Sequence, residues 1–344
     1  MNAAQHGIPA VVDLLWPRLT TALTGPAGAA PLAAKAAALA PIRRGGFECR
    51  LAAGHDVLDL QQCVYHKDGE PAQLLAHLQN NAAFGHPIWR QVRTLMEMLA
   101  TDAQPWCASV AELWLEFDAD GSDWLPSLFV GATPGIDAAA RTAIWTALFE
   151  ILRPPLPDAL QRCIANFGAR ISHLGFMLGR GVDEVRVNIK NLSVDDAAAV
   201  LETLAWPGDR AAAAEILELV RHMDCHFTLC LDIGAAVAPS LGIECYPPSG
   251  ERCIEQWARL LDVVVAHGLA APEKAAALLA WPGRVAPQPG RSWPLDLLAE
   301  SLVRTSPGFT HFDCHISHVK LGVRPQRPIE AKGYLWFEHR WQMS

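Results

Sequence analysis

The chain has 344 residues, of which 51% are hydrophobic and 19% charged, so it can bury a large core and is not globally disordered. Its net charge of −8 argues against a broad nucleic-acid-binding surface. Residues 1–17 lack the pattern of a secretory signal, and no apolar run reaches the roughly 18 residues of a membrane span. The nine cysteines include no CxxC pair. We therefore expect a cytoplasmic protein with free thiols and no membrane partner.

Strand-like pairs alternate with helix-like regions along the chain. Helices are predicted over residues 11–24, 31–39, 71–101, 137–166, 194–223 and 251–280. Hairpins are predicted near residues 47–65, 112–130, 171–190, 227–246 and 316–337. Short turns rich in Gly, Asp and Pro indicate antiparallel pairing, which argues against a TIM barrel or a doubly wound sheet. We therefore expect five ααββ units in a single domain spanning residues 1–344.

Two sequence echoes favour true repetition. Leu-Ala-Trp-Pro-Gly occurs at residues 204–208 and 279–283, where each copy is expected to end a helix. His-x-Asp-Cys-His occurs at residues 222–226 and 311–315, where each copy is expected to lead into the first strand of a hairpin.

The predicted strands have one apolar and one polar face. In residues 184–190, for example, Val185 and Val187 alternate with Arg186 and Asn188. The helices need the apolar faces as partners, so the polar faces must point to water or into a lumen. A flat sheet is one alternative, but ten strands tend to close, and a barrel well above eight strands leaves a solvated interior. The expected fold is an α/β protein with a ten-stranded antiparallel closed β-barrel ringed by helices.

Cations at alternate strand positions then suggest a family. Lys332-Gly333-Tyr334 is similar to the K-x-Y strand motif of the ABBA, or PT-barrel, prenyltransferases, and residues 186–190 and 318–320 supply further cations at the same spacing. In element order the resemblance covers nearly the whole chain. In size and style the chain looks nearest to the cyanobactin-type peptide prenyltransferases.

The resemblance implies a transferase that moves a dimethylallyl or geranyl group from its diphosphate onto an aromatic or peptide side-chain acceptor. Cations and a phenol would hold the leaving diphosphate, for which the candidates are Arg186, Lys190, Lys320, Lys332 and Tyr334. The carbocation shield and acceptor pocket would contain Trp114, Tyr246, Trp336, Asp232 and Glu244. Glu48 and Glu116 are the candidate catalytic acids or bases.

Some features depart from the family pattern. The predicted lumen contains more acids than bases, with Asp59, Asp118 and Glu330 among them, and the chain has only three tyrosines. Mg²⁺ between carboxylates and diphosphate would reconcile this excess, as would a cationic acceptor; no organic cofactor is expected. Two alternatives stay open: a non-catalytic peptide- or ligand-binding barrel in a biosynthetic pathway, and an enzyme of another reaction class on the same fold.

Two further motifs have simpler explanations. His311, Cys314, His315 and His318 could ligate zinc, but successive strand residues face opposite ways and the spacing is not that of a zinc finger. Polar residues at the barrel edge and a buried thiol are the favoured interpretation, and no metal site is predicted. The glycine-rich residues 175–181 precede a strand, so they are predicted to form a hairpin turn rather than a phosphate loop.

Overall fold

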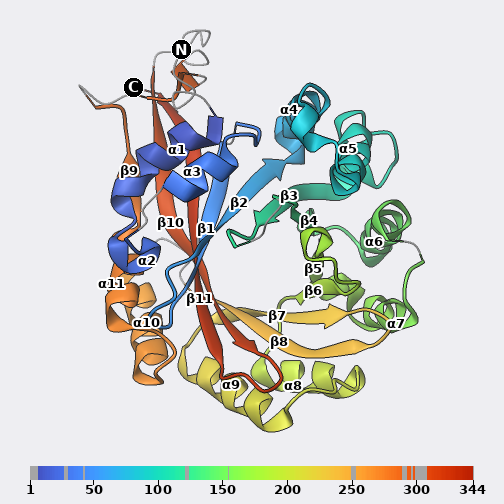
Figure 1. The fold of residues 1–344 in the computed structure, drawn as a ribbon. Helices are drawn as coiled ribbons and strands as arrows, with labels where there is room; N and C mark the ends of the chain where they lie inside the picture. Colours follow the sequence, from blue (N-terminus) through green and yellow to red (C-terminus); the bar gives the residue numbers. More distant parts are fainter. Residues whose placement is uncertain are drawn as a thin grey trace.

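One antiparallel sheet forms the centre of the molecule (Figure 1). The computed structural model describes residues 7–26, 30–41, 43–120, 124–153, 155–248, 253–288, 293–295, 297–298 and 308–343. The strands are β1 (Arg44–Arg50), β2 (Leu58–Tyr65), β3 (Val110–Phe117), β4 (Ser127–Ala132), β5 (Ile171–Phe176), β6 (Val185–Ile189), β7 (His226–Ile233), β8 (Val237–Tyr246), β9 (Gly283–Val285), β10 (Gly308–Val323) and β11 (Glu330–Met343).

The sheet closes into a barrel because β11 pairs with both β10 and β1. Ten strands form the ring in the order β11-β1-β2-β3-β4-β5-β6-β7-β8-β10, and β9 adds a short strand on β10. Every adjacent pair is antiparallel, for example β6 with β7 through Val187 and Leu231. The expected closed ten-stranded barrel is confirmed.

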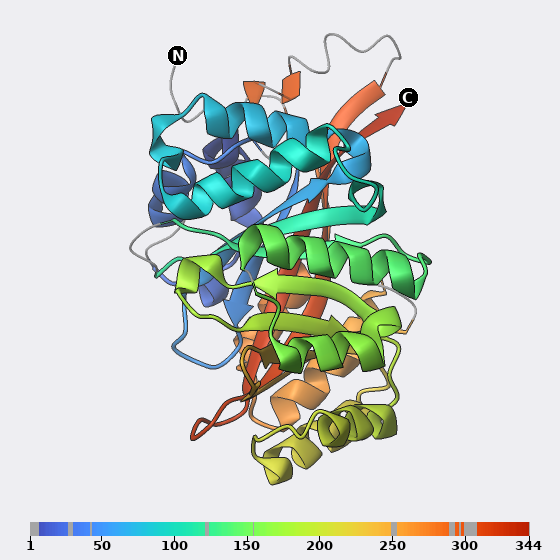
Figure 2. The ribbon, with the colours of Figure 1, turned by 90° about the vertical axis from the view of Figure 1, so that its right-hand side faces the viewer.

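Helices surround the outside of this ring (Figures 1 and 2). They are α1 (Gly7–Leu15), α2 (Thr21–Thr24), α3 (Ala30–Ala36), α4 (Glu70–Gln79), α5 (Pro87–Ala100), α6 (Ala138–Leu152), α7 (Asp158–Phe167), α8 (Val194–Thr203), α9 (Arg210–His222), α10 (Ile254–Ala266) and α11 (Pro272–Ala280). Within the described residues, no helix has both the length and the apolar character that crossing a bilayer requires.

The core lies between the helices and the outer face of the barrel. On β3, Leu113, Leu115 and Phe117 are fully buried in this layer, whereas Trp114 and Glu116 point into the lumen. The same alternation places apolar side chains of every ring strand against the helices. The lumen is therefore left to the polar and aromatic side chains.

The last hairpin is longer than expected. β10 begins at Gly308 rather than near residue 316, since its first half pairs with β11 and, at Phe312 to Cys314, with β9. Consequently the second His-x-Asp-Cys-His copy lies inside β10, whereas the first spans the end of α9 and the start of β7. The two copies are not structurally equivalent, and the expectation that both lead into a strand is wrong for the second.

Trp281 fixes the closing seam of the barrel to the helices. It follows α11, is fully buried, and donates its Nε1 hydrogen to the carbonyl oxygens of His315 and Trp336, at 3.1 Å each. Its ring also meets Phe47 edge to face, with centroids 5.9 Å apart. One indole thus contacts β10, β11 and β1, the three strands that close the ring.

We predict that Trp281→Ala lowers the free energy of unfolding by about 3–5 kcal/mol, because it empties a buried site and leaves the seam without its indole. Val182→Ala is the control, since Val182 is 39% exposed and a surface truncation changes stability by about 0.5 kcal/mol or less. Urea denaturation followed by circular dichroism measures both. Equal losses for the two variants would contradict this role of Trp281.

Candidate active site

Two connected cavities occupy the lumen. The larger, which we call the wide chamber, has a volume of about 760 Å³. The smaller, which we call the cation pocket, has a volume of about 60 Å³ and lies toward the turn between β10 and β11. Arg186, Lys320 and Tyr334 line both cavities. A ligand with a compact charged end and a larger uncharged part could therefore span the two.

The cation pocket concentrates positive charge. Five cationic side chains line it, namely Arg180, Arg186, Lys320, Arg324 and Lys332, against the three carboxylates Glu48, Asp232 and Glu330. Such a cluster is suited to a multiply charged anion such as a diphosphate.

Each of these cations contacts a carboxylate in the unliganded protein. The pairs are Lys332 with Glu48 (2.5 Å), Arg180 with Asp118 (2.7 Å), Arg186 with Asp232 (2.8 Å), Lys320 with Glu244 (2.9 Å) and Arg324 with Glu330 (3.8 Å). The acid excess expected for the lumen is thus distributed as counter-ions, which compensate the burial of the cations.

Glu48 is held by the two residues of the K-x-Y motif. Lys332 Nζ donates to its Oε1 and the Tyr334 hydroxyl to its Oε2, at 2.5 Å each. Burial alone would raise the pKa of Glu48, but Lys332 and Tyr334 together hold it well below its usual range. Burial and the nearby Glu48 charge raise the pKa of Tyr334. Glu48 is therefore an ionised counter-ion, and Tyr334 a neutral donor.

Lys320 lies where the two cavities join. Its Nζ donates to Glu244 Oε1 at 2.9 Å, and Glu244 also accepts the Tyr246 hydroxyl at 3.1 Å. A Cβ at Gly242 would lie 2.9 Å from Lys320 Cε, so a glycine on β8 leaves the space in which this lysine lies. Burial would raise the pKa of Glu244, but Lys320 and His318 hold it well below the usual range.

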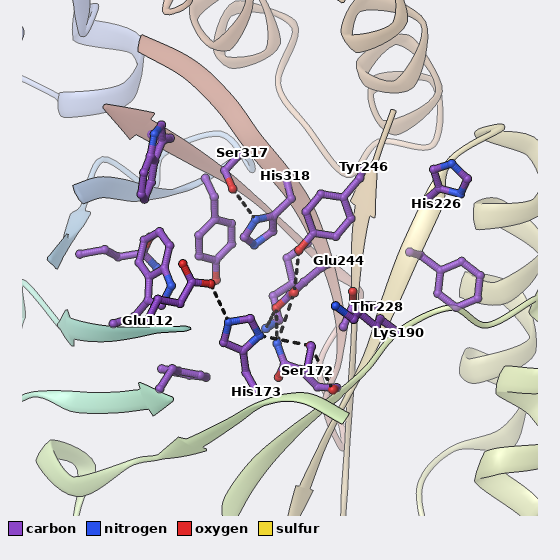
Figure 3. Close-up of a pocket in the computed structure, with 18 of the residues that line it drawn as sticks. Glu112, Ser172, His173, Lys190, His226, Thr228, Glu244, Tyr246, Ser317 and His318 are labelled. Atoms are coloured by element: carbon purple, nitrogen blue, oxygen red, sulfur yellow. Dashed lines mark hydrogen bonds and ion pairs between the residues drawn. The ribbon is translucent and has the colours of Figure 1, made fainter. Parts of the chain in front are cut away.

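Aromatic rings line the wide chamber (Figure 3). The centroids of Trp114 and Trp336 are 4.9 Å apart. His318 stacks on Tyr334 with centroids 4.0 Å apart and rings 17° from parallel, and the centroid of Tyr246 lies 5.3 Å from that of His318. These ring faces could stabilise an adjacent carbocation.

A register shift in β10 lets His315 face the chamber together with His318. Ile316 pairs with Leu335 and His318 with Tyr334, so Ser317 is an extra residue and the alternation of β10 changes phase there. His315 and His318 therefore both line the chamber, while Ile316 and Val319 are fully buried on the other side.

Glu116 differs from the other lumen acids. Its Oε1 accepts a hydrogen bond from Gln61 Nε2 at 2.8 Å, and no described cation forms an ion pair with it. Burial and the negative charge of Glu48 raise its pKa to about 7. Such a group can accept a proton near neutral pH.

Glu112 pairs with His173 in the chamber wall (Figure 3). His173 Nε2 and Glu112 Oε1 are 3.0 Å apart, and a Cβ at Gly131 would lie 2.6 Å from that nitrogen, so the glycine makes the pair fit. Burial would raise the pKa of Glu112, but the contact with His173 lowers it overall.

The structure groups most, but not all, of the candidate residues as the sequence suggested. Arg186, Lys320, Lys332 and Tyr334 meet in the cation pocket, whereas Lys190 lines only the wide chamber. Of the shield and acceptor residues, Trp114, Tyr246, Trp336 and Glu244 line the chamber, but Asp232 lies in the cation pocket with Arg186. Of the candidate acids, Glu116 lines the chamber and Glu48 the cation pocket.

Sequence reasoning missed two cations. Arg180 lies in the turn between β5 and β6, and Arg324 follows β10, so neither takes part in the strand alternation that identified the others. A polar residue in a hairpin turn looks solvent-exposed in sequence. Here closure of the barrel turns both side chains toward the pocket.

The His/Cys cluster does not converge. Cys314 is buried on the outer side of β10, opposite to His315. Among the described residues, no three or more His, Cys, Asp or Glu side chains are grouped so that they could hold a metal ion.

Comparisons with known proteins were made by sequence and by structure. No family model matches the chain, and no curated protein matches its sequence. Among solved structures, it is similar to 6-dimethylallyltryptophan synthase from Micromonospora olivasterospora in complex with DMASPP and Trp (TM-score 0.57, 15% identity, 96% of this chain and 97% of that chain). It is also similar to the prenyltransferase PriB in a ternary complex with L-tryptophan and dimethylallyl thiolodiphosphate (TM-score 0.56, 15% identity, 94% of each chain).

A third similar structure is 5-dimethylallyltryptophan synthase from Streptomyces coelicolor (TM-score 0.54, 14% identity, 96% of this chain and 97% of that chain). These likenesses span nearly the whole chain but concern tryptophan enzymes, so the expected nearness to cyanobactin-type peptide prenyltransferases is not confirmed. In fold, this chain is a PT-barrel: a closed ten-stranded antiparallel barrel ringed by helices, with its candidate site inside.

Proposed function

We propose that this protein is a prenyltransferase that moves a dimethylallyl or geranyl group from its diphosphate onto an aromatic acceptor, with residues 1–344 acting as one barrel domain. The observation that carries the proposal is the direct junction of the cation pocket with the aromatic chamber at Arg186, Lys320 and Tyr334. An allylic diphosphate has a charged head and an apolar tail, and this lumen offers one cavity for each.

The cation pocket would hold the leaving group. When the bond between the allylic carbon and the diphosphate oxygen breaks, the electron pair stays on the diphosphate and negative charge develops there. Arg186, Lys320 and Lys332, with the Tyr334 hydroxyl, would stabilise this charge. Glu48 and Asp232 keep Lys332 and Arg186 in place before the substrate arrives.

The wide chamber would hold the carbocation and the acceptor. Trp114, Trp336, Tyr334 and Tyr246 offer aromatic rings to the cation. A carbon of the acceptor ring then forms the new bond to the allylic carbon, and the ring loses one proton, for which Glu116 is the proposed base.

We propose Glu116, in preference to Glu48, as the base that acts on the aromatic acceptor. It lines the chamber, whereas Glu48 is engaged by Lys332 and Tyr334. As a carboxylate, Glu116 would accept a hydrogen bond from an acceptor N–H or O–H group and draw electron density into the ring.

Five cationic side chains surround the site of the diphosphate and could donate hydrogen bonds to its oxygens directly, without Mg²⁺. The carboxylates that could accompany a metal, Glu48 and Asp232, already bind Lys332 and Arg186. We propose that the side chains alone bind the diphosphate.

Calorimetric titration with dimethylallyl and geranyl thiolodiphosphates, with and without Mg²⁺, tests the proposal. The expected result is micromolar binding without Mg²⁺, followed by transfer from the natural diphosphates to an aromatic acceptor. Binding only when Mg²⁺ is present would contradict the proposal that the side chains alone bind the diphosphate. The alternative is a non-catalytic barrel, which the complete internal pairing of the five cations would suit. Absence of thiolodiphosphate binding in both conditions would favour that alternative.

We predict that Arg324→Gln weakens thiolodiphosphate binding about 10- to 100-fold, because it removes one charge-assisted contact. Arg324 is a cleaner choice than Lys332, whose removal would leave the buried Glu48 without its counter-ion. The matched control is Arg340→Gln: the two arginine side chains are 48% and 47% exposed, but Arg340 lines the wide chamber. Titration of both variants decides; a larger loss for Arg340→Gln would place the diphosphate in the chamber instead.

We predict that kcat/KM for the acceptor falls as the pH is lowered through about 7, because the raised pKa of Glu116 means that its carboxylate becomes protonated there. Glu116→Gln should be slow and should lack this acidic limb. Glu112→Gln is the control and should keep it, since contact with His173 lowers the pKa of Glu112. Rates measured from pH 5.5 to 8.5 provide the test. If Glu116→Gln shows the same decrease of kcat/KM at low pH as the wild type, the titrating group is a chamber histidine.

A further inference from the structure

Lys190 differs from the other cationic side chains of the lumen. The chamber's remaining Lys and Arg residues each pair with a carboxylate: Arg186 with Asp232, Lys320 with Glu244, and Arg340 with Glu338. Within the part of the chain that the structure describes, Lys190 forms no ion pair and its ammonium makes no hydrogen bond. It is nevertheless part of the chamber wall.

Its position separates Lys190 from the proposed diphosphate site. It directly follows β6, where its backbone N–H donates to the Arg170 carbonyl at 3.0 Å, and it does not line the cation pocket. It lies four residues beyond Arg186, which is roughly 13 Å along an extended strand. An anion held by Lys190 is therefore a different group from the diphosphate.

Among the described residues, no carboxylate lies within ion-pair distance of Lys190. Burial and the Arg141 guanidinium lower the pKa of Lys190 and outweigh the attraction of the Glu112 carboxylate, which contacts His173. Arg141 is itself buried, with its guanidinium donating to the Ile171 carbonyl at 2.8 Å. An anion brought by a ligand would complete this site.

Uncharged donors lie in the same wall. Ile189 pairs with Leu229, so Lys190 comes next to Thr228 across the β6–β7 ladder, and Figure 3 shows the two together beside Tyr246. Asn191 lines the same cavity with its side-chain amide. Ser172 lines it too, but its hydroxyl donates to the Asn188 carbonyl at 3.3 Å. An ammonium with hydroxyl and amide donors around it matches a carboxylate, whose two oxygens accept several hydrogen bonds.

We propose that Lys190 binds a carboxylate of the acceptor, so that the acceptor is an aromatic acid, such as a free aromatic amino acid, and not a neutral aromatic compound. This inference rests on the proposed prenyl transfer. It makes Lys190 a specificity residue: it lies away from the reacting atoms and acts by fixing one end of the acceptor while the aromatic ring reaches the junction with the cation pocket.

The test uses acceptors that differ only in the carboxylate. L-Tryptophan and tryptamine form one pair, and L-tyrosine and tyramine the other, each with dimethylallyl diphosphate and the wild-type, Lys190→Met and Lys190→Arg proteins. The wild type should show a lower KM for the acids. Lys190→Met should raise the KM of the acids about 10- to 100-fold, with kcat and the KM of the amines nearly unchanged. Lys190→Arg should restore part of the loss.

A parallel titration with dimethylallyl thiolodiphosphate separates the failures. If Lys190→Met weakens thiolodiphosphate binding, Lys190 is a diphosphate ligand and the inference is overturned. Equal KM values for acids and amines in the wild type, or equal losses for both in Lys190→Met, overturn it as well, while prenyl transfer stands. Absence of thiolodiphosphate binding in the wild type overturns both proposals.

Discussion

Closure of the sheet is the constraint on which the rest of the structure depends. β11 pairs with β1 on one side and β10 on the other, so the ring strands have no free edge to satisfy elsewhere. Once closed, a strand has only two environments, the helix layer and the lumen. The apolar half of each strand is buried against helices, and every polar residue of the other half contributes to a shared interior. The site is a direct consequence of this division.

Electrostatic pairing makes such an interior stable without a ligand. Burying a cation is unfavourable unless a negative charge lies next to it. In the cation pocket, carboxylates from neighbouring strands pair with the buried cations. The pairs also orient the cations before any anion enters, which is the condition for stabilising charge that develops during a reaction. The acids that make the composition of the lumen look unsuited to a diphosphate are thus the residues that hold the cations in position.

The two ends of the lumen differ in character. Toward the β10–β11 turn lies the small cavity with the five cations. The larger cavity is lined by aromatic rings, histidines and Glu112. Arg186, Lys320 and Tyr334 belong to both parts, so charge separation would take place at this junction. The similar structures differ from this chain at about 85% of aligned positions, so its acceptor must be inferred from its own chamber residues.

The sequence by itself determined the strands, their faces and hence the barrel, because alternation with period two depends only on neighbouring residues. It therefore identified Lys332, Tyr334, Arg186 and Lys320 as lumen residues. Tertiary structure decided which of them meet. The register of β1 against β11 sets Glu48 opposite Tyr334, the extra residue Ser317 brings His315 to the same side as His318, and the turns bring in Arg180 and Arg324. Strand alternation gives the face of a residue and its spacing along its own strand, but not which residues of different strands lie at the same height. Only the folded chain could therefore group Arg186 with Lys320 and leave Lys190 outside the cation pocket.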